Sequence, residues 1–408
     1  MIRHPGPTIV LEVSPLAQGA FGLSTYIRGL LGGLSRLVAA GEIQARFRLL
    51  YINPHEPPPP PPEGTFENLV ARFPRRLAQR VWARSGILPL DAFVRCDLFH
   101  GCAHVVPRTR CPAWTTMHDV SWRAFPESFG ASARTFNENF CGPSLRHCLE
   151  SGGGIVSVSS FTASEVERHY GIPVARQRVI HEAADPRRNP SQVGMVEAAR
   201  SWMGIHTGRP YLLCLGLVER RKNIEASIAA WEAIRDRGID CALAVVGKDG
   251  VGAEEIRRRA AASPWSADVR FPGRAPADLV DPLYEGAAAV LYLSHYEGFG
   301  LPVLEAMAAG TPVLVSDRSS LPEVWGPAPS TDPELVVDPS RTQRAADLLS
   351  PLLTDSPARR RYADHGRARA GSFSWEATAR LTWEAWMSSL CRPGARATGR
   401  SHPKAPTP

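Results

Sequence analysis

Two carboxylates, Glu297 and Glu305, lie eight positions apart in the segment EGFGLPVLE. The short apolar run at 287–294 before them predicts a buried parallel strand. Gly298 and Gly300 allow backbone N–H groups to approach a ligand closely, and the proline two positions later suits the first turn of a helix. Because a helix N-terminus attracts anions, this segment predicts a phosphate site. Two solvated or capping carboxylates are the simpler alternative.

A group of cations follows the strand-like run at 211–215. Arg220, Arg221 and Lys222 are consecutive in a loop that leads into a predicted helix. Lysine occurs only three times in this arginine-rich chain, so Lys222 stands out. Fixed cations at such a turn stabilise the departure of a diphosphate leaving group. A solvated run of charges is the simpler alternative.

The N-terminal half offers further candidates where predicted strands meet loops or helices. Gly19 and Gly22 form a loop before a helix-like stretch, which predicts a site for an anion or an acceptor, but their spacing is not that of a NAD-binding fingerprint. His118 follows a strand in the sequence Thr-Met-His-Asp, where an ordinary hydrogen-bonded loop histidine is the alternative to a ligand contact. Ser159 or Ser160 is expected to cap a helix.

The elements that must position these residues alternate along the chain. Strand-like runs at 8–13, 47–52, 113–117 and 154–158 alternate with helical stretches, and a second alternating series runs from 211 to about 371. This pattern predicts two domains, each built on a parallel sheet. The predicted boundaries are a first domain at 1–186 with an exposed proline-rich loop at 53–64, a linker at 187–209, a second domain at 210–371, a helix at 372–390 and a disordered tail at 391–408.

The composition limits the classes of protein that fit. A chain of 408 residues with 44% hydrophobic and 21% charged residues suits a soluble protein of two ordinary domains. No run reaches the roughly 18 apolar residues of a membrane span, and the N-terminus lacks a signal-type cleavage site, so we predict a cytoplasmic protein. The net charge of +7 comes without an aromatic and basic module, so no nucleic-acid partner is expected.

Metal and membrane contacts are weaker hypotheses. The eight cysteines show no C-x-x-C pair and no zinc-type spacing, which predicts reduced thiols and no metal site. His100 and His104 could suggest a metal, but a structural placement is favoured. In the segment 72–84 an arginine recurs every fourth residue beside apolar side chains. Such a helix can lie on anionic lipid, which would place the protein at the inner face of a membrane, although a solvated helix is favoured.

The longer segment EGFGLPVLEAMAAGTPVLVSD resembles the signature of the retaining glycosyltransferases of family 4. Pro272-Gly273, the stretch at 277–287, the Ser319–Glu323 segment and Phe373-Ser-Trp375 follow one another as in that family. The likeness covers roughly residues 9 to 390 and is weakest between about 53 and 95. It implies an α/β protein of the GT-B fold, with two Rossmann-like domains facing a cleft and a C-terminal helix that crosses back to the first domain.

The resemblance also implies roles for single residues. Lys222 would contact the diphosphate of a nucleotide-sugar donor, Glu305 the ribose hydroxyls, Glu297 the transferred sugar, and His118 would lie beside that sugar. Many family members carry an arginine where this chain has Leu217, so either Arg220 or Arg221 would supply a second cation, or the site has only one. The other implied donor-binding residues are Gly273, Gly298, Phe299, Gly300 and Leu301. The family's Asn-Gly-x-Asp sequence before the linker is replaced here by His181-Glu-Ala-Ala-Asp185, which puts the hinge and the acceptor contacts in doubt.

The predicted function is transfer of a hexose from a nucleotide diphosphate sugar to a glycan or lipid-linked acceptor, with retention at the anomeric carbon, in polysaccharide or lipopolysaccharide synthesis. GDP-mannose is the first choice of donor, because the Arg-Lys-Asn and His-Asp sequences resemble the mannosyltransferase branch, and UDP- and ADP-sugars are the alternatives. We expect activity without a metal, since no Asp-x-Asp motif stands in a suitable position. A GT-B sugar-nucleotide epimerase and a non-catalytic sugar-nucleotide-binding protein are the rival hypotheses.

Overall fold

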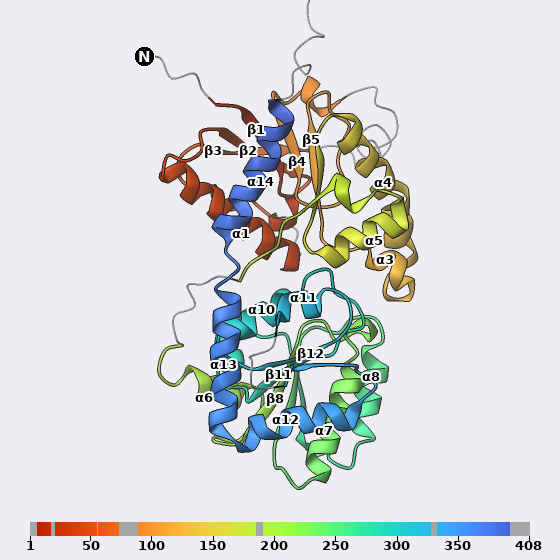
Figure 1. Ribbon diagram of the computed structural model, residues 1–408, viewed down its shortest axis with the longest axis vertical. Helices are drawn as coiled ribbons and strands as arrows, with labels where there is room; N and C mark the ends of the chain where they lie inside the picture. Colours follow the sequence, from red (N-terminus) through yellow and green to blue (C-terminus); the bar gives the residue numbers. More distant parts are fainter. Residues whose placement is uncertain are drawn as a thin grey trace, which may run out of the picture.

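The computed structural model describes residues 6–17, 21–54, 56–72, 89–184, 191–327 and 333–391. Within them the chain forms two sheets whose strands all pair in parallel, one in each of two α/β units stacked along the long axis of the molecule (Figure 1). The first sheet has the order β3-β2-β1-β4-β5-β6-β7 and the second β10-β9-β8-β11-β12-β13. The alternation of strands and helices in the sequence therefore predicts the architecture correctly.

The strands of the first sheet are β1 Thr8–Glu12, β2 Arg46–Ile52, β3 Phe66–Ala71, β4 Leu98–Gly101, β5 Ala113–Met117, β6 Gly154–Ser157 and β7 Gln177–Val179. Those of the second are β8 Tyr211–Leu215, β9 Ala242–Val246, β10 Val269–Gly273, β11 Ala289–Tyr292, β12 Val313–Ser316 and β13 Val336–Val337. Every residue of β5, β9 and β11 is buried. Such continuous apolar strands are expected where helices cover both faces of a parallel sheet.

The helices around the first sheet are α1 Phe21–Ala39, α3 Ser121–Ala124, α4 Ala131–Glu150 and α5 Ser160–Tyr170. The second sheet is accompanied by α6 Met195–Trp202, α7 Ile224–Asp236, α8 Ala253–Ala261, α9 Val280–Gly286, α10 Leu301–Ala308, α11 Leu321–Trp325, α12 Thr342–Thr354 and α13 Ser356–Ala370. The last helix is α14 Trp375–Leu390. Ser159 is the N-cap of α5, where its hydroxyl accepts from Thr162 N–H, so the predicted serine cap is confirmed at 159.

The order of the strands determines where a ligand can bind. In each sheet the first three strands in the sequence are added toward one edge, and the later strands are added on the other side of the first strand. The order therefore reverses between β1 and β4 in the first sheet and between β8 and β11 in the second. Ligands of open α/β sheets bind outside the carboxyl ends of the strands at such a switch point. The candidate cations follow β8 and Glu297 follows β11, so both lie at the switch point of the second sheet.

The C-terminal helix returns to the first domain, as predicted (Figure 1). Gly29 and Gly33 of α1 let α14 approach closely, since a Cβ atom at Gly29 would lie 2.1 Å from the Trp375 ring. Trp386 of α14 is buried and donates its indole N–H to His100 Nδ1 over 3.2 Å. His100 also forms a 3.0 Å hydrogen bond with Thr116 Oγ1 and is thus engaged within the core, in agreement with the favoured structural placement.

The segment predicted as a linker at 187–209 is not entirely a loop. Helix α6 occupies its middle, and Arg200 of this helix donates to Gly286 O at the end of α9 over 3.0 Å. The prolines at 57–62 lie in a loop between β2 and β3, as expected. Residues 73–88 and 392–408 lie outside the described residues, and with them most of the predicted basic helix and the tail.

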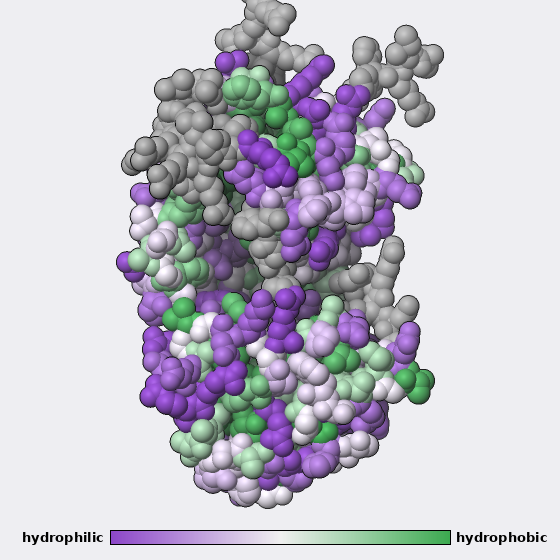
Figure 2. All heavy atoms as spheres, turned by 180° about the vertical axis from the view of Figure 1, so that it is seen from behind, coloured by the Kyte–Doolittle hydropathy of each residue, from purple (hydrophilic) through white to green (hydrophobic). Residues whose placement is uncertain are grey.

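Figure 2 shows polar side chains gathered along the junction between the two domains on the side opposite to Figure 1. Among the described residues, no helix combines the length and the apolar character that crossing a bilayer requires.

Candidate active site

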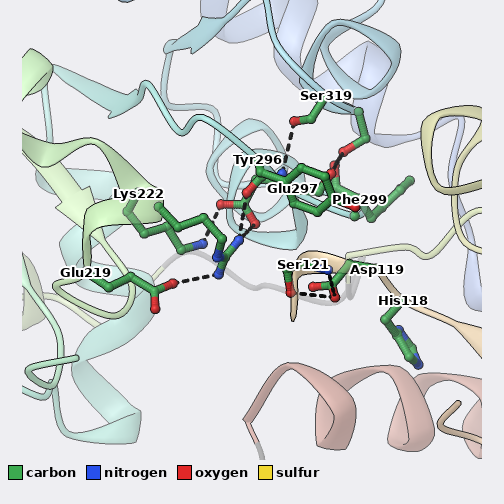
Figure 3. A network of polar contacts seen from close by, with 12 residues as sticks. His118, Asp119, Ser121, Glu219, Lys222, Tyr296, Glu297, Phe299 and Ser319 are labelled. Carbon is green, nitrogen blue, oxygen red and sulfur yellow. Dashed lines mark hydrogen bonds and ion pairs between the residues drawn. The ribbon is translucent and has the colours of Figure 1, made fainter. Parts of the chain in front are cut away.

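Two cations and two carboxylates meet after β8 and β11 (Figure 3). Lys222 donates from Nζ to Glu297 Oε1 and to Tyr292 Oη, each over 2.6 Å. Arg221 donates to Glu297 Oε2 over 3.1 Å and to Glu219 Oε1 over 2.7 Å. The side chains of Lys222 and Arg221 are each 14% exposed, so the cluster is largely shielded from water. Ion pairs in such surroundings are strong and directional.

The charges of this cluster determine the protonation of Glu297. Burial opposes its ionisation, but the charges of Lys222 and Arg221 lower the pKa of Glu297 to about 2. Burial also lowers the pKa of Lys222 below its ordinary value, although Glu297 opposes this shift. Glu297 is therefore a carboxylate at neutral pH, able to accept hydrogen bonds but not to deliver a proton.

The structure brings Arg221, and not Arg220, together with Lys222. Arg220 extends away from the cluster and donates from Nε to Glu255 Oε2 over 2.8 Å at the surface. A short 3-10 turn at Arg220–Lys222 directs adjacent side chains to different sides. Leu217, which stands where many family members carry arginine, is 47% exposed at the same turn.

The glycine segment before α10 is held by two serines of the second domain. The N–H of Glu297 donates to Ser319 Oγ over 3.0 Å, and the Ser320 hydroxyl donates to Phe299 O over 2.7 Å. Gly300 has a φ of 113°, and α10 begins at Leu301, so the predicted helix start is correct within one residue. Only glycine adopts this φ without strain, which explains its place directly before the helix.

Gly298 also lies at a contact between the two domains. A Cβ atom at this position would lie 1.6 Å from His118 O in the first domain. The glycine therefore permits the two domains to touch, in addition to any approach of a ligand. Gly273 ends β10 with a φ of 87°, Gly22 lies in the first turn of α1, and Gly19 is outside the described residues.

Two buried tyrosines support the predicted donor-binding groups, and neither was expected from the sequence. Tyr284 of α9 donates its hydroxyl to Glu305 Oε2 over 3.0 Å, and Tyr292 accepts from Lys222. Tyr292 lies inside an apolar run and Tyr284 follows Leu283 in a helix-like stretch, so a sequence pattern predicts both as core residues. The hydroxyl orients a partner while the ring packs in the core. The available signal in the sequence was their proximity to the predicted strand at 287–294, which Tyr284 precedes by three residues and in which Tyr292 lies two residues from the end.

His118 lies across the cleft from the Glu297 cluster, and its ring points away from Glu297 in Figure 3. It forms hydrogen bonds through Nδ1 with Glu182 Oε1 over 2.9 Å and through Nε2 with Cys102 O over 3.0 Å. Both partners are acceptors, so the arrangement suits an imidazolium ring, in which both nitrogens carry hydrogen. Burial acts against this charge, but the hydrogen bond and the charge of Glu182 raise the pKa of His118 above its ordinary value.

Asp119, the neighbour of His118, lies between the histidine and the Glu297 cluster (Figure 3). Its Oδ1 accepts from the N–H of Ser121 over 3.0 Å and from the Ser121 hydroxyl over 2.7 Å. These bonds hold the carboxylate at the start of α3. No group of three or more His, Cys, Asp or Glu side chains in the described part of the chain is arranged to hold a metal ion.

Comparison with known proteins identifies matching families and a similar relative. Residues 196–369 match the family described as glycosyl transferases group 1, and residues 22–188 match the one described as glycosyltransferase family 4. The chain is 31% identical to the O-antigen chain mannosyltransferase B of Escherichia coli over 288 residues, which cover 68% of this chain and 71% of that protein.

Solved structures agree on the fold. Sucrose-phosphate synthase from Thermosynechococcus elongatus has a TM-score of 0.67 at 21% identity, over 93% of this chain and 98% of that one. HepE from Anabaena, solved in complex with UDP and glucose, has a TM-score of 0.62 at 16% identity, over 94% of this chain and 99% of that one. These likenesses confirm the predicted GT-B fold. Together with the sequence matches, they show that the chain belongs to glycosyltransferase family 4, whose members transfer glycosyl groups.

Proposed function

We propose that this glycosyltransferase moves a hexose from a nucleotide diphosphate sugar to a glycan or lipid-linked acceptor with retention of anomeric configuration, in polysaccharide or lipopolysaccharide synthesis. The observation that carries the proposal is the pair of cations, Lys222 and Arg221, held against Glu297 beside the N-terminus of α10. A leaving diphosphate needs fixed positive charge and N–H dipoles in a site with little water. The structure offers both at the switch point of the second sheet.

The chain's own groups have distinct roles in this proposal. Lys222, with Arg221, holds the diphosphate, and Glu305 accepts hydrogen bonds from the ribose hydroxyls, with Tyr284 fixing one of its oxygens. Glu297 accepts from hydroxyls of the transferred hexose, which suits a group that stays ionised at neutral pH. No metal is assigned, because the two cations supply the charge stabilisation that a metal would otherwise give.

The reaction then proceeds on one face of the sugar. The bond between the anomeric carbon and the phosphate oxygen breaks, the acceptor oxygen bonds to the same carbon, and the acceptor's proton passes to the departing phosphate. An α-linked donor gives an α-linked product by this route. The one-bond carbon–proton coupling of the product's anomeric centre checks this outcome, and a β-linked product would reject retention.

Mannose is the first choice of sugar and GDP-mannose the first choice of donor. The relative in Escherichia coli is named a mannosyltransferase, and the Arg-Lys-Asn sequence at 221–223 resembles that branch. HepE, which was solved with UDP and glucose, makes UDP-glucose the alternative.

Donor binding is tested by thermal shift with GDP-mannose, UDP-glucose and ADP-glucose, since a bound donor raises the melting temperature by mass action. We expect the largest rise with GDP-mannose, followed by mannose transfer to an acceptor. Conversion of the donor to another sugar nucleotide without an acceptor would instead indicate an epimerase. Donor binding with no turnover on any acceptor tested would favour a non-catalytic binding protein.

A further inference from the structure

Four consecutive residues, Tyr296 to Phe299, make contacts that alternate between the two domains. The Tyr296 side chain and the Gly298 carbonyl contact the first domain, whereas the Glu297 carboxylate contacts the cations of the second domain. Phe299 lies against the segments where the chain passes between the domains. This stretch is called the bridging segment below.

Tyr296 is inserted into the core of the first domain. Its side chain is 4% exposed and belongs to a cluster whose other buried members all come from that domain. The ring lies 5.2 Å from the ring of Phe161 and 5.7 Å from that of Phe125. Its hydroxyl accepts from the N–H of Val120 over 3.3 Å. A ring enclosed in this way cannot leave the first domain without opening a cavity behind it.

The backbone next to Glu297 is held by first-domain hydroxyls as well. Gly298 O accepts from Ser159 Oγ over 2.5 Å and from Thr162 Oγ1 over 2.9 Å. Both donors belong to the first turn of α5 and its cap. The peptide that follows Glu297 is therefore oriented by groups of the other domain.

Phe299 completes the segment at the crossing between the domains. Its ring centre lies 5.8 Å from that of His181, before the linker, and 5.9 Å from that of Phe373, before α14. His181 in turn contacts Glu323 of α11 over 2.7 Å, and Glu323 also accepts from the backbone N–H of Ser160. Groups of the first domain thus contact Tyr296, Gly298 and Phe299 of the bridging segment.

The cation cluster is connected directly to Tyr296. Arg221 donates from one nitrogen, Nη1, both to Tyr296 O over 2.7 Å and to Glu297 Oε2 over 3.1 Å. A displacement of Tyr296 would therefore move the carbonyl that orients Arg221 together with the carboxylate that pairs with it. The positions of Arg221 and Glu297 thus depend on how Tyr296 packs in the first domain.

We propose that Tyr296 is a positioning residue whose insertion into the first domain sets the Glu297 carboxylate and the Arg221 guanidinium in their reactive arrangement. The Tyr296 side chain belongs to the bridging segment and packs among buried residues of the first domain. The donor site is therefore fully formed only while this side chain stays inserted there. This inference rests on the proposed transfer reaction for its kinetic readout, but its structural readout does not depend on that reaction.

The kinetic test compares Tyr296→Ala with Tyr296→Phe in the full chain. Misplacement of reacting groups by about 1 Å can cost on the order of 100-fold in rate, so we expect Tyr296→Ala to lower kcat by about that factor, with a smaller change in donor KM. Tyr296→Phe keeps the ring and loses only the contacts of its hydroxyl with the N–H of Val120 and with Glu165, so we expect a loss of only about threefold. The matched control is Tyr170→Ala, which removes a ring packed on the same cluster from within the first domain. It should lower the melting temperature without lowering kcat more than about twofold.

A second variant acts from the opposite domain. Thr162→Val keeps the shape of the side chain and removes one hydroxyl from Gly298 O. In the double variant, the loss of kcat should be smaller than the product of the two single losses, because Thr162→Val and Tyr296→Ala both release the bridging segment. Fully multiplicative losses would show that the two residues act separately and would overturn the proposal.

Amide hydrogen exchange supplies the readout that is independent of activity. In Tyr296→Ala the peptide containing residues 297–300 should exchange faster, while peptides of β8 and β11 keep their protection. If the wild type transferred no sugar, this exchange result would still decide the role of Tyr296. Unchanged exchange at 297–300, or kcat within about twofold of wild type in Tyr296→Ala, would contradict the inference.

Discussion

At the scale of single residues, the candidate site is a balance of charges. Lys222 and Arg221 face Glu297 and Glu219, so the formal charges of the four side chains cancel. The Lys222 ammonium has three N–H donors, of which Tyr292 and Glu297 take two, and the third has no acceptor in the described part of the chain. An incoming diphosphate can use this donor first and then compete with Glu297 for the remaining charge.

Lys222→Ala should therefore lower kcat by roughly two to three powers of ten while the protein stays folded. Steady-state kinetics with the preferred donor, together with a melting curve, measure both effects. Lys248→Ala is the control, because it removes the next lysine along the chain, which is exposed after β9. Wild-type turnover in Lys222→Ala would exclude the assigned role.

The contact between His118 and Glu182 predicts a stability that depends on pH. The pKa of His118 is raised in the folded state, so the pair stabilises the fold fully below the unfolded pKa, near 6.5. This stabilisation is lost as the pH rises through the folded pKa. Glu182→Gln lowers that folded pKa, and should destabilise the protein by roughly 1–2 kcal/mol at about pH 6 and by less at about pH 9.

Melting curves of the wild type and Glu182→Gln at the two pH values test this prediction. Glu150→Gln is the control, since Glu150 pairs at the surface with Arg108, whose charge does not change in this range. A destabilisation by Glu182→Gln that is equal at both pH values would show that His118 is not charged in the folded protein.

At the scale of helices and strands, most of the second domain could be predicted, because its strands are continuous apolar runs bounded by glycine. Strand β3 was missed because it lies at an edge and half of its residues are exposed, and β13 is only two residues long. The helix in the predicted linker was missed because few of its residues are buried. The spacing of apolar residues predicts only those helices and strands that bury a face, so elements with few buried residues are not detected.

The same reasoning explains what the sequence revealed of the site. The consecutive basic residues after β8 indicated the cations of the site. They did not indicate which arginine side chain points toward Glu297, because the 3-10 turn at Arg220–Lys222 determines that direction. The pairing of His118 with Glu182 joins residues 64 positions apart, and no local pattern encodes it. Tyr284 and Tyr292 were hidden because their rings satisfy the core pattern while their hydroxyls serve the site.

Helix α10 carries the prediction that belongs to this scale. Glu305→Gln keeps the shape of the side chain but weakens recognition of the ribose, and should raise donor KM about tenfold with little change in kcat. Tyr284→Phe, on the neighbouring α9, should raise donor KM about threefold, because it removes one hydrogen bond that orients Glu305.

Donor titrations of these two variants are compared with Tyr211→Phe, which removes a buried hydroxyl bonded to Leu283 O and not to Glu305. This control should lose stability and keep its donor KM. A large fall of kcat in Glu305→Gln at unchanged donor affinity would move Glu305 into the chemical step.

At the scale of the whole molecule, the proposed reaction needs two domains and no metal. With Lys222 and Arg221 providing the charge at the diphosphate, transfer should continue at its full rate after EDTA treatment and dialysis. Initial rates before and after the treatment, with Mg²⁺ or Mn²⁺ added back, measure this. A loss of activity that only the added metal restores would contradict it.

The return of α14 to the first domain has a consequence for the order in which the protein is made. Trp386 donates to His100 and Ser389 accepts from Trp114, so the interior of the first domain includes residues that leave the ribosome after the whole second domain. The second domain needs no such late arrival for its sheet, since β8 to β13 are complete by Val337. The domain that is translated first is therefore finished last, and until α14 emerges its helix α1 presents bare glycines where Trp375 will lie.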